Sequence, residues 1–417
     1  MDITPNNISE VSKRDKLVLP DNRYGLGERI GGAQIFKEGQ ADLRQLGLGD
    51  TSVVVRSGQN LQTAIDKVFS LGGGTVYLGS GTHLQTSDII IPSNVTVSGS
   101  GIESSIIDFQ SLSFGIKIIG SDSYTTGTVA VSENSQTVAG TLTVWTSAMV
   151  GRYILLAGIW YLISAVASGT SLTIAAPFAD DDLTGASYVI ATTNDNVRIK
   201  QLSINNSATV GITGQFINEL MLQDISFQGN VIDIDIDDSS SVTWEKITSA
   251  ASFVTSIQAT NVHYSEISST GIVDALSDDA LQLNTCSSLV LRNVYALNAA
   301  GDGIQITSCS DILFSGVGVR VCGGHGVHLV SGNNNISIAN GAYEDNAGDG
   351  IRLAATSDRC FITGNSLEGN GAYGVNIVAS NCNNNLILGN NLSGNATAAN
   401  NAGTGTLIRS NVGLADN

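Results

Sequence analysis

Five chemically capable side chains recur at a nearly constant spacing in the last third of the sequence. Each opens a similar short unit, such as Asp279-Ala-Leu-Gln-Leu, and successive units are 23, 23, 24 and 24 residues apart. These residues are Asp279, Asp302, His325, Asp349 and Tyr373. Close carboxyl groups push their pKa values apart and can supply one acid and one base at neutral pH. We therefore expect catalysis from Asp279 and Asp302, with Asp278 and His325 beside them.

A polar position follows three residues after each member of this column. It holds Gln282, Gln305, His328, Arg352 and Asn376. If the column stacks on adjacent strands, this second set forms a ladder on one sheet face. Amide, imidazole and guanidinium groups suit sugar hydroxyls, so the ladder is predicted to bind substrate, together with Asp349 and Tyr373. No motif for a metal ion or a cofactor is present, and we expect neither.

The aspartates also have a purely structural interpretation. Asp302 and Asp349 precede glycine, and aspartate is a common turn residue at a coil corner. Asp278 and Asp279 are favoured for function because their coil is counted as the longest, at 27 residues. Residues 271–276 would then form an extra loop over the face, and extra loops tend to carry function.

A separate acidic run alternates with isoleucine in Val231-Ile-Asp-Ile-Asp-Ile. Strict alternation predicts a strand with isoleucine on one face and aspartate on the other. Asp235, between Asp233 and Asp237, is a further candidate for binding sugar hydroxyls or a cation. A solvated sheet face is the alternative.

A repeat of short strands must position all of these residues. Strand-like segments such as Asn196-Val-Arg-Ile and Ser288-Leu-Val-Leu recur, and residues 197, 220, 242, 262, 289, 312, 336 and 360 mark the period. Their steps are 23, 22, 20, 27, 23, 24 and 24. A period of this size with such short strands predicts one coil of a parallel β-solenoid per repeat. The absence of regular leucines and of repeated helices argues against a leucine-rich horseshoe.

The chain divides into four predicted parts. Residues 1–50 have little periodicity and are expected to form an extended docking segment. Residues 51–121 hold an amphipathic helix, predicted to cap the solenoid, and the first coils. Residues 122–194 break the repeat and resemble an antiparallel meander, a small inserted β-barrel with Trp145 and Trp160 in its core. Residues 195–417 form the main β-helix.

The composition of the chain argues against several classes of binding partner. The net charge of −18, from 37 acidic and 19 basic residues, disfavours nucleic acid and anionic membranes. No apolar stretch is long enough for a transmembrane helix, and no secretory signal is visible. The five cysteines lack metal-type spacing and are expected to be buried thiols, with Cys286 and Cys309 in one core column.

The segment Ala64-Ile-Asp, Gly72-Gly-Gly-Thr-Val-Tyr-Leu and Gly81-Thr-His resembles the opening of the pectate-lyase-like superfamily of right-handed β-helices. The resemblance covers roughly residues 50–395. The inserted part, with Gly151-Arg-Tyr-Ile and Trp160-Tyr-Leu-Ile, is similar to modules of phage tail proteins. Within the superfamily, phage tailspikes are homotrimers that bind and often cleave bacterial surface polysaccharide. They need no signal peptide, since virions leave by lysis.

The catalytic column also resembles that of polygalacturonases. Asp279, Asp302, Gly324-His325-Gly326 and Arg352 match that family's motifs. Gly301 stands where the family has a first aspartate, and Leu353-Ala354 replaces its Ile-Lys. The missing lysine and the net charge favour a neutral or weakly charged glycan over polygalacturonate.

Taken together, these features predict an all-β, right-handed parallel β-helix that binds a bacterial polysaccharide and depolymerises it as a glycoside hydrolase. We expect a tailspike-like homotrimer, in a virion or secreted, that meets phage tail or baseplate proteins through its N-terminal segment. His325 and Arg352 would orient the sugar. The alternatives are a monomeric polygalacturonase-like hydrolase, a lyase or epimerase on a related helix, and a non-catalytic glycan-binding or structural β-helix.

Overall fold

The structure is a computed structural model and describes residues 26–30, 33–36, 41–42 and 51–413. The predicted docking segment, residues 1–50, lies mostly outside them. Three short strands are described within it, and they pair as an antiparallel sheet. They are β1 (Leu26–Ile30), β2 (Ala33–Phe36) and β3 (Ala41–Asp42).

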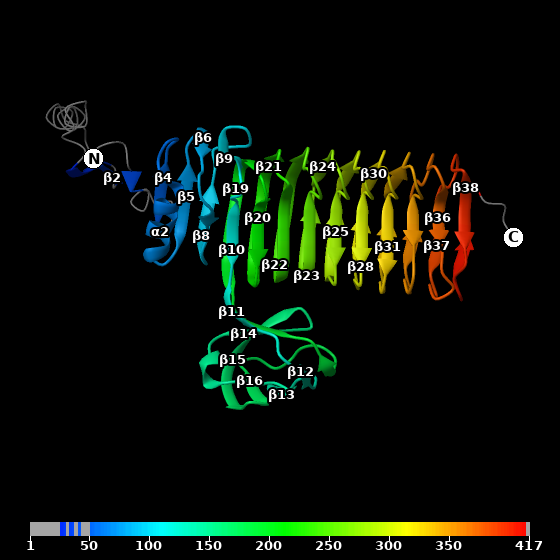
Figure 1. Cartoon of the computed structure of the whole chain (residues 1–417), viewed down its shortest axis with the longest axis horizontal. Coiled ribbons are helices and arrows are strands. Elements are labelled where there is room, and N and C mark those ends of the chain that lie inside the picture. The colour runs from blue at the N-terminus through cyan, green and yellow to red at the C-terminus, as the bar shows by residue number, and fades with distance from the viewer. Residues whose placement is uncertain (1–25, 31–32, 37–40, 43–50, 414–417) are drawn as a thin grey trace, which may run out of the picture.

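The described chain from residue 51 onward is a long rod of stacked coils with a small unit on one side (Figure 1). Most coils contribute strands to three faces, and these strands pair in parallel with their equivalents in the next coil; in the last coils the third face has only isolated bridges. This confirms the predicted parallel β-helix.

Face 1 carries the predicted site. It consists of β7 (Ile89–Ile90), β10 (Ile116–Ile119), β20 (Val210–Gln215), the first parts of β22 (Ile232–Ala250) and β23 (Ile257–Ser268), β25 (Leu281–Asn284), β28 (Ile304–Thr307), β31 (Val327–Ser331), β34 (Ile351–Leu353), β36 (Tyr373–Ile377) and β38 (Thr397–Asn401).

Face 2 follows face 1 along the chain in each of the later coils. It consists of β4 (Ser52–Val55), β5 (Gly74–Leu78), β8 (Val95–Ser98), parts of β19 (Asn194–Ser207), β21 (Ile217–Gln228), β22 and β23, then β26 (Ser287–Arg292), β29 (Leu313–Ser315), β32 (Ser337–Ala339), β35 (Phe361–Thr363), β37 (Leu386–Leu388) and β39 (Leu407–Arg409).

Face 3 completes the coil and leads back to face 1. It consists of β6 (Gly81–Leu84), β9 (Ser105–Leu112), the last parts of β19, β21 and β22, then β24 (Gly271–Val273), β27 (Tyr295–Leu297), β30 (Gly318–Arg320) and β33 (Ala342–Glu344).

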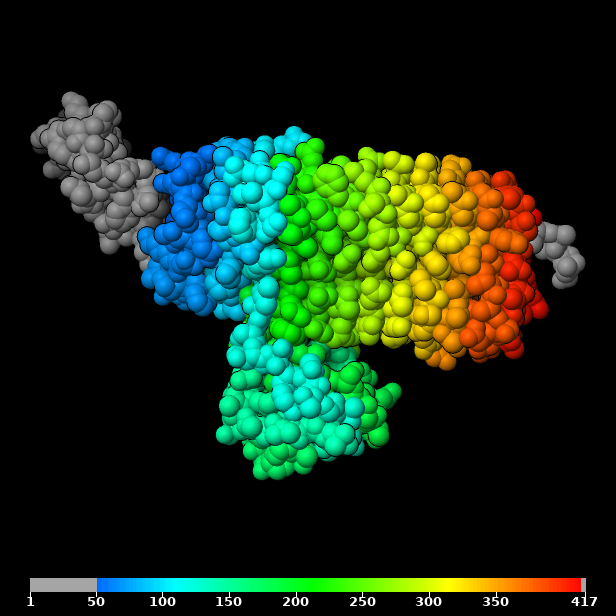
Figure 2. Space-filling view, viewed as in Figure 1, coloured from blue at the N-terminus to red at the C-terminus, as the bar shows by residue number. Residues whose placement is uncertain are grey.

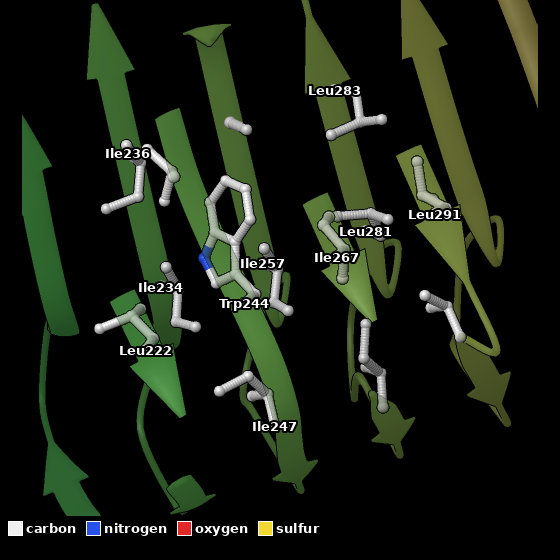
Figure 3. Close-up of a cluster of buried hydrophobic side chains, with 14 of the residues drawn as sticks. Leu222, Ile234, Ile236, Trp244, Ile247, Ile257, Ile267, Leu281, Leu283 and Leu291 are labelled. Carbon is white, nitrogen blue, oxygen red and sulfur yellow. The ribbon is translucent and has the colours of Figure 1, made fainter. Parts of the chain in front are cut away.

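The core is a continuous apolar column inside the coils. Alternation along each strand sends every second side chain inward, so isoleucine and leucine from successive coils stack at the strand spacing. Figure 3 shows Trp244, which is fully buried, among Ile234 and Ile236 of its own strand β22 and Ile257 of β23. The five cysteines are free and buried, as predicted, and the backbone N–H of Cys286 donates to Sγ of Cys309 one coil away.

One helix covers the N-terminal end of this stack, as predicted. It is α2 (Leu61–Ser70), and it packs on β4 and β5. Asn60 caps it by accepting the Thr63 N–H at 2.9 Å. Leu61 and Ile65 are buried under it, but Phe69, at the expected apolar spacing, is 51% exposed.

An antiparallel unit interrupts the solenoid between β10 and β19 and stands off its side (Figures 1 and 2). Its core contains Trp145, and Trp160 is also buried, packed where the unit meets the solenoid, so neither ring is an open sugar platform. It consists of β11 (Ser121–Tyr124), β12 (Thr128–Val131), β13 (Thr137–Thr141), the 3₁₀ turn η2 (Ser147–Met149), β14 (Tyr153–Leu156), β15 (Ile159–Ser168), β16 (Ser171–Ile174), β17 (Leu183–Ala186) and β18 (Val189–Thr192).

Two register expectations were wrong. Residue 262 was taken as the repeat position of its coil, but Ser265 pairs with Leu289 there, so the coil is not longer than its neighbours. Residues 271–276 are therefore not an extra loop, since β24 is a regular strand that pairs with β22 and β27. Asp233 does not share a face with Asp235: it is fully buried, because the N–H groups of Asp233 and Ile234 both donate to Ser256 O and turn it inward.

Candidate functional site

The column lies where the chain passes from face 3 to face 1. Leu281, Ile304, Val327, Ile351 and Val375 are paired in register along face 1. Asp279, Asp302, His325, Asp349 and Tyr373 each lie two residues before one of these and so stack on successive coils. The structure therefore brings all five predicted column residues together.

The first four members of the column each accept a backbone N–H of the next coil. Oδ1 of Asp279 accepts the N–H of Asp302 at 2.5 Å, and Oδ1 of Asp302 accepts the N–H of His325 at 2.5 Å. Nδ1 of His325 then accepts the N–H of Asp349 at 2.8 Å, and Oδ1 of Asp349 accepts the N–H of Tyr373 at 3.0 Å. This ladder satisfies backbone donors at a loop that has no strand partner for them.

Glycines before the column residues make this ladder possible. A Cβ built on Gly301 would lie 2.4 Å from Asp279 Oδ1, and one on Gly324 would lie 2.2 Å from Asp302 Oδ1. Any larger residue would push the carboxylate of the preceding coil away. With the Asp279 carboxylate in this position, no side chain fits at Gly301.

The polar ladder engages the second oxygens. Gln282 and Gln305 donate from Nε2 to Oδ2 of Asp279 at 3.0 and 2.8 Å. Nδ1 of His328 donates to Oδ2 of Asp302 at 2.8 Å. Arg352 and Asn376 likewise donate to Oδ2 of Asp349, at 3.3 and 2.9 Å. The predicted binding residues thus contact the predicted catalytic ones directly.

The column carboxylates and the polar ladder differ in their exposure to solvent. Asp279 and Asp302 are only 3% and 8% exposed. The side chains of His328 and Arg352 are 19% and 32% exposed, so they present the surface that a ligand meets first. Asp278 is half-buried beside Asp279, and its Oδ2 accepts from Gln282 at 3.4 Å.

The surroundings of Asp279 and Asp302 shift the pKa values of the two carboxyl groups in opposite directions. Burial raises the pKa of Asp279 to about 6, against the hydrogen bonds from Asp302 N–H and Gln282 that lower it. Burial also acts on Asp302, but the hydrogen bonds from His328 and the His325 N–H, and the nearby imidazoles, bring its pKa below the usual value. Burial lowers the pKa of His325, against the nearby carboxylates of Asp302 and Asp349 that raise it. An acid and a base on neighbouring coils are the pattern of carboxylate pairs that cleave glycosides.

One cluster in the described part of the chain has the composition of a cation site. Ligand atoms of Asp302, His325 and His328 lie within 4.8 Å of one another. Two of these groups already accept hydrogen bonds, however: Nδ1 of His325 accepts the Asp349 N–H, and Oδ2 of Asp302 accepts from Nδ1 of His328. The hydrogen bonds account for this cluster without a metal, and we assign none to it.

The polar row on face 1 extends beyond the predicted residues. Asp235 pairs in register with Gln258, and Gln258 with Gln282, so the row runs from β22 to β36 without interruption. Gln258 was missed by the sequence analysis. The alternation in Ile257-Gln258-Ala259, with Ile257 and Ala259 buried, is the signal that identifies it as outward.

Comparison with known proteins establishes the fold. The family model described as a right-handed β-helix region matches residues 250–412, which confirms the predicted handedness. Among solved structures, the A-module of the mannuronan C-5 epimerase AlgE6 of Azotobacter vinelandii is 14% identical, with a TM-score of 0.54 over 84% of this chain and 94% of that one. The surface adhesin PfbA of Streptococcus pneumoniae is 14% identical, with a TM-score of 0.50 over 87% of this chain and 99% of that one.

A tailspike, gp61 of Pseudomonas phage phi297, is also similar, at 12% identity and a TM-score of 0.45 over 83% of this chain and 72% of that one. A search of curated proteins found no sequence match. At these identities the similarity concerns the fold alone. No helix in the described residues combines the length and apolar character of a membrane span.

Proposed function

We propose that this chain binds an extended bacterial polysaccharide across face 1 and hydrolyses it at Asp279 and Asp302. The observation that carries the proposal is the contact between an outward row of sugar-compatible side chains and a carboxyl pair with divided pKa values. Gln282, Gln305 and His328 belong to the row and also donate to the pair. A glycan held by the row would therefore lie against the acid.

The proposed chemistry uses the separation of neighbouring coils. Adjacent strands are about 4.8 Å apart, near the carboxyl separation of about 5 Å in glycosidases that retain anomeric configuration. Asp279, protonated, gives its proton to the glycosidic oxygen while the Asp302 carboxylate attacks the anomeric carbon. Water, losing a proton to Asp279, then releases the sugar from Asp302. His325 and Arg352 position the ring.

A second candidate function is glycan binding without cleavage. It is favoured by the hydrogen bonds that already occupy both oxygens of Asp279 and of Asp302. In that case the Asp279 column only connects neighbouring coils by hydrogen bonds, and the polar row on face 1 alone contacts the ligand.

The proposed biological form is a tailspike-like homotrimer, in a virion or secreted, with residues 1–50 as the docking segment for phage tail or baseplate proteins. Support comes from the sequence resemblance and from exposed apolar side chains on face 2. Phe361 is 41% exposed and Leu407 is 48% exposed there. Such a face suits a second copy of the chain.

The decisive experiment is hydrolysis of purified capsular and O-antigen polysaccharides, measured as new reducing ends. We expect Asp279→Asn to lower the rate by about 10²–10⁴-fold, because general acid catalysis contributes about that much. The rate of the unmodified chain should fall above about pH 6, where Asp279 loses its proton.

Asp358→Asn is the matched control. Oδ1 of Asp358 accepts the N–H of Asn383 at 2.6 Å, which is the same kind of bond between coils outside the column. If Asp279→Asn and Asp358→Asn cleave at the rate of the unmodified chain, the acid role is wrong. If glycans bind and none is cleaved, the second candidate function replaces the first.

A further inference from the structure

A cleft of about 680 Å³ lies between the antiparallel unit and the solenoid, at the corner from face 1 to face 2. Asp180 and Tyr188 line it from the antiparallel unit, while Asp238, Tyr264 and Asp311 line it from the solenoid, with Tyr264 one coil beyond Asp238 and Asp311 two coils beyond Tyr264. No residue of this cleft belongs to the Asp279 column. Thr285, in its lining, follows the last residue of β25 and lies three residues after Gln282, or about 10 Å.

The two walls are locked together. Trp160 donates from Nε1 to Ile217 O at 3.1 Å, and its ring packs with Leu155 and Phe216. Gly158, at φ +84°, closes the turn between β14 and β15 directly over the His263 ring, and a Cβ there would lie 2.5 Å from His263 Cγ. The cleft is therefore a preformed feature of the fold.

A directed hydrogen-bond chain forms the floor. Nε2 of His263 faces Oδ1 of Asn261 at 2.8 Å and must donate, so Nδ1 accepts from the Ser287 hydroxyl at 2.6 Å. Asn261 in turn donates to Oδ1 of Asp238 at 2.7 Å. Burial lowers the pKa of His263 to about 4, so this ring is neutral under ordinary conditions.

The lining has one sign of charge. It includes the carboxylates of Asp180, Asp238 and Asp311, and none of the residues that line this cleft is lysine or arginine. An anionic ligand would be repelled with no cation to offset the repulsion. Carboxylates do, however, accept hydrogen bonds well from hydroxyl and amide N–H groups.

An aromatic ring and an apolar wall complete the cleft. Tyr264 is 44% exposed, and Leu155 and Val189 of the antiparallel unit also line the cleft, although only 4% and 7% of their surface is exposed. Sugars present hydroxyl groups at their edges and C–H groups on their faces, so a ring that lies on Tyr264 can direct its hydroxyls to Asp238 and Asp311.

We infer that this cleft is a second saccharide-binding site, which takes an uncharged sugar segment and excludes uronates. It is independent of hydrolysis at the Asp279 column and would anchor a glycan whether or not the chain cleaves it.

The test uses an array of bacterial capsular and O-antigen polysaccharides of known composition, some uncharged and some rich in uronate. The full chain should retain uncharged polysaccharides. Tyr264→Ala should weaken their retention at least tenfold, since it removes the ring on which the sugar lies. Asp238→Asn with Asp311→Asn should reduce the discrimination against uronate-rich polysaccharides, because only one of the three carboxylates, Asp180, is left to repel them.

Tyr295→Ala is the matched control, since Tyr295 is an exposed tyrosine (60%) on face 3, away from the cleft. It should retain the array like the unmodified chain, and thermal unfolding verifies that all variants are folded. Asp279→Asn should slow cleavage by about 10²–10⁴-fold without changing retention by the cleft, which separates the two proposals. The inference is overturned if no uncharged polysaccharide is retained, if Tyr264→Ala retains them like Tyr295→Ala, or if the double variant still excludes uronates as the unmodified chain does.

Discussion

Single polar side chains in this solenoid connect one coil to the next. Asp279, Asp302 and Asp349 each use one oxygen in the same way, as acceptors of a backbone N–H one coil on. That bond cannot distinguish a catalytic residue from a structural one, because all of them make it. The second carboxylate oxygen does distinguish them, because it accepts from Gln305, His328 or Asn376, and these side chains differ in their donor group and charge. Within the column, the Asp279–Asp302 pair combines neighbouring carboxyls with opposite pKa shifts.

Asp233 gives a prediction about pH and stability. It is fully buried, accepts hydrogen bonds from Asn230 and Ser249, and burial raises its pKa to about 7 from the usual 3.8. Between about pH 4 and 7, Asp233 therefore keeps its proton in the folded state but has lost it in the unfolded state. The free energy of unfolding falls as the pH rises through that window. We expect the free energy of unfolding to fall by at most about 1.4 kcal/mol per pH unit. Asp233→Asn should not show this fall.

The measurement is urea unfolding between pH 4 and 8. Asp181→Asn, at an exposed aspartate of the antiparallel unit, is the control and should follow the unmodified chain. Parallel curves for the unmodified chain and Asp233→Asn would show that Asp233 is already ionised at acid pH in the folded protein.

At the level of the element, asparagine ladders hold the corners of the later coils from inside. Oδ1 of Asn370 accepts from both N and Nδ2 of Asn346, and Asn370 donates to Tyr343 O and to Asn395. Asn370→Ala would leave several buried groups unpaired at about 1–3 kcal/mol each. We expect the free energy of unfolding to fall by about 2–4 kcal/mol.

The exposed Asn381 supplies the control in chemical unfolding, and Asn381→Ala should remain within about 0.5 kcal/mol of the unmodified chain. A loss of the same small size for Asn370→Ala would mean that water replaces the ladder.

The repeat could be predicted from the sequence because strand alternation and coil length are local properties. Val197, Leu220 and Val242 were aligned correctly, and so was the series from Leu289 onward. The assignment of residue 262 was wrong because Val262 and the true position, Ser265, both lie in one long strand, and apolar character pointed to the valine. Asp233 was misplaced because a bulge leaves no trace in alternation.

The site was predictable to a similar extent. The stacking of the Asp279 column follows from spacing alone. The burial of its carboxylates does not, because it depends on which backbone groups of the next coil lack a partner. The cleft at Tyr264 was missed because the insertion point, between β10 and β19, lies far in sequence from Asp238 and Asp311.

On the scale of the whole molecule, face 2 changes character along the rod. Its earlier coils carry exposed ion pairs, among them Arg198 with Glu219 and Arg292 with Glu266. Its later coils instead carry exposed apolar side chains, and Leu313, Phe361 and Leu407 lie in one row of the register. Exposed apolar side chains that lie in a row favour contact with another protein surface. We therefore expect copies of the chain to meet at the later coils.

This arrangement makes the proposed trimer testable in solution. Light scattering should give three times the chain mass of 43.2 kDa. Phe361→Glu should shift the mass to that of one chain, since each copy would place a carboxylate in the apolar contact, where burying an unpaired charge is costly. Tyr295→Glu, on face 3, should leave the trimer intact. A single-chain mass for the unmodified protein would contradict the tailspike-like assembly and leave a free-standing polysaccharide-binding β-helix, whereas a trimer that survives Phe361→Glu would place the contact on another face.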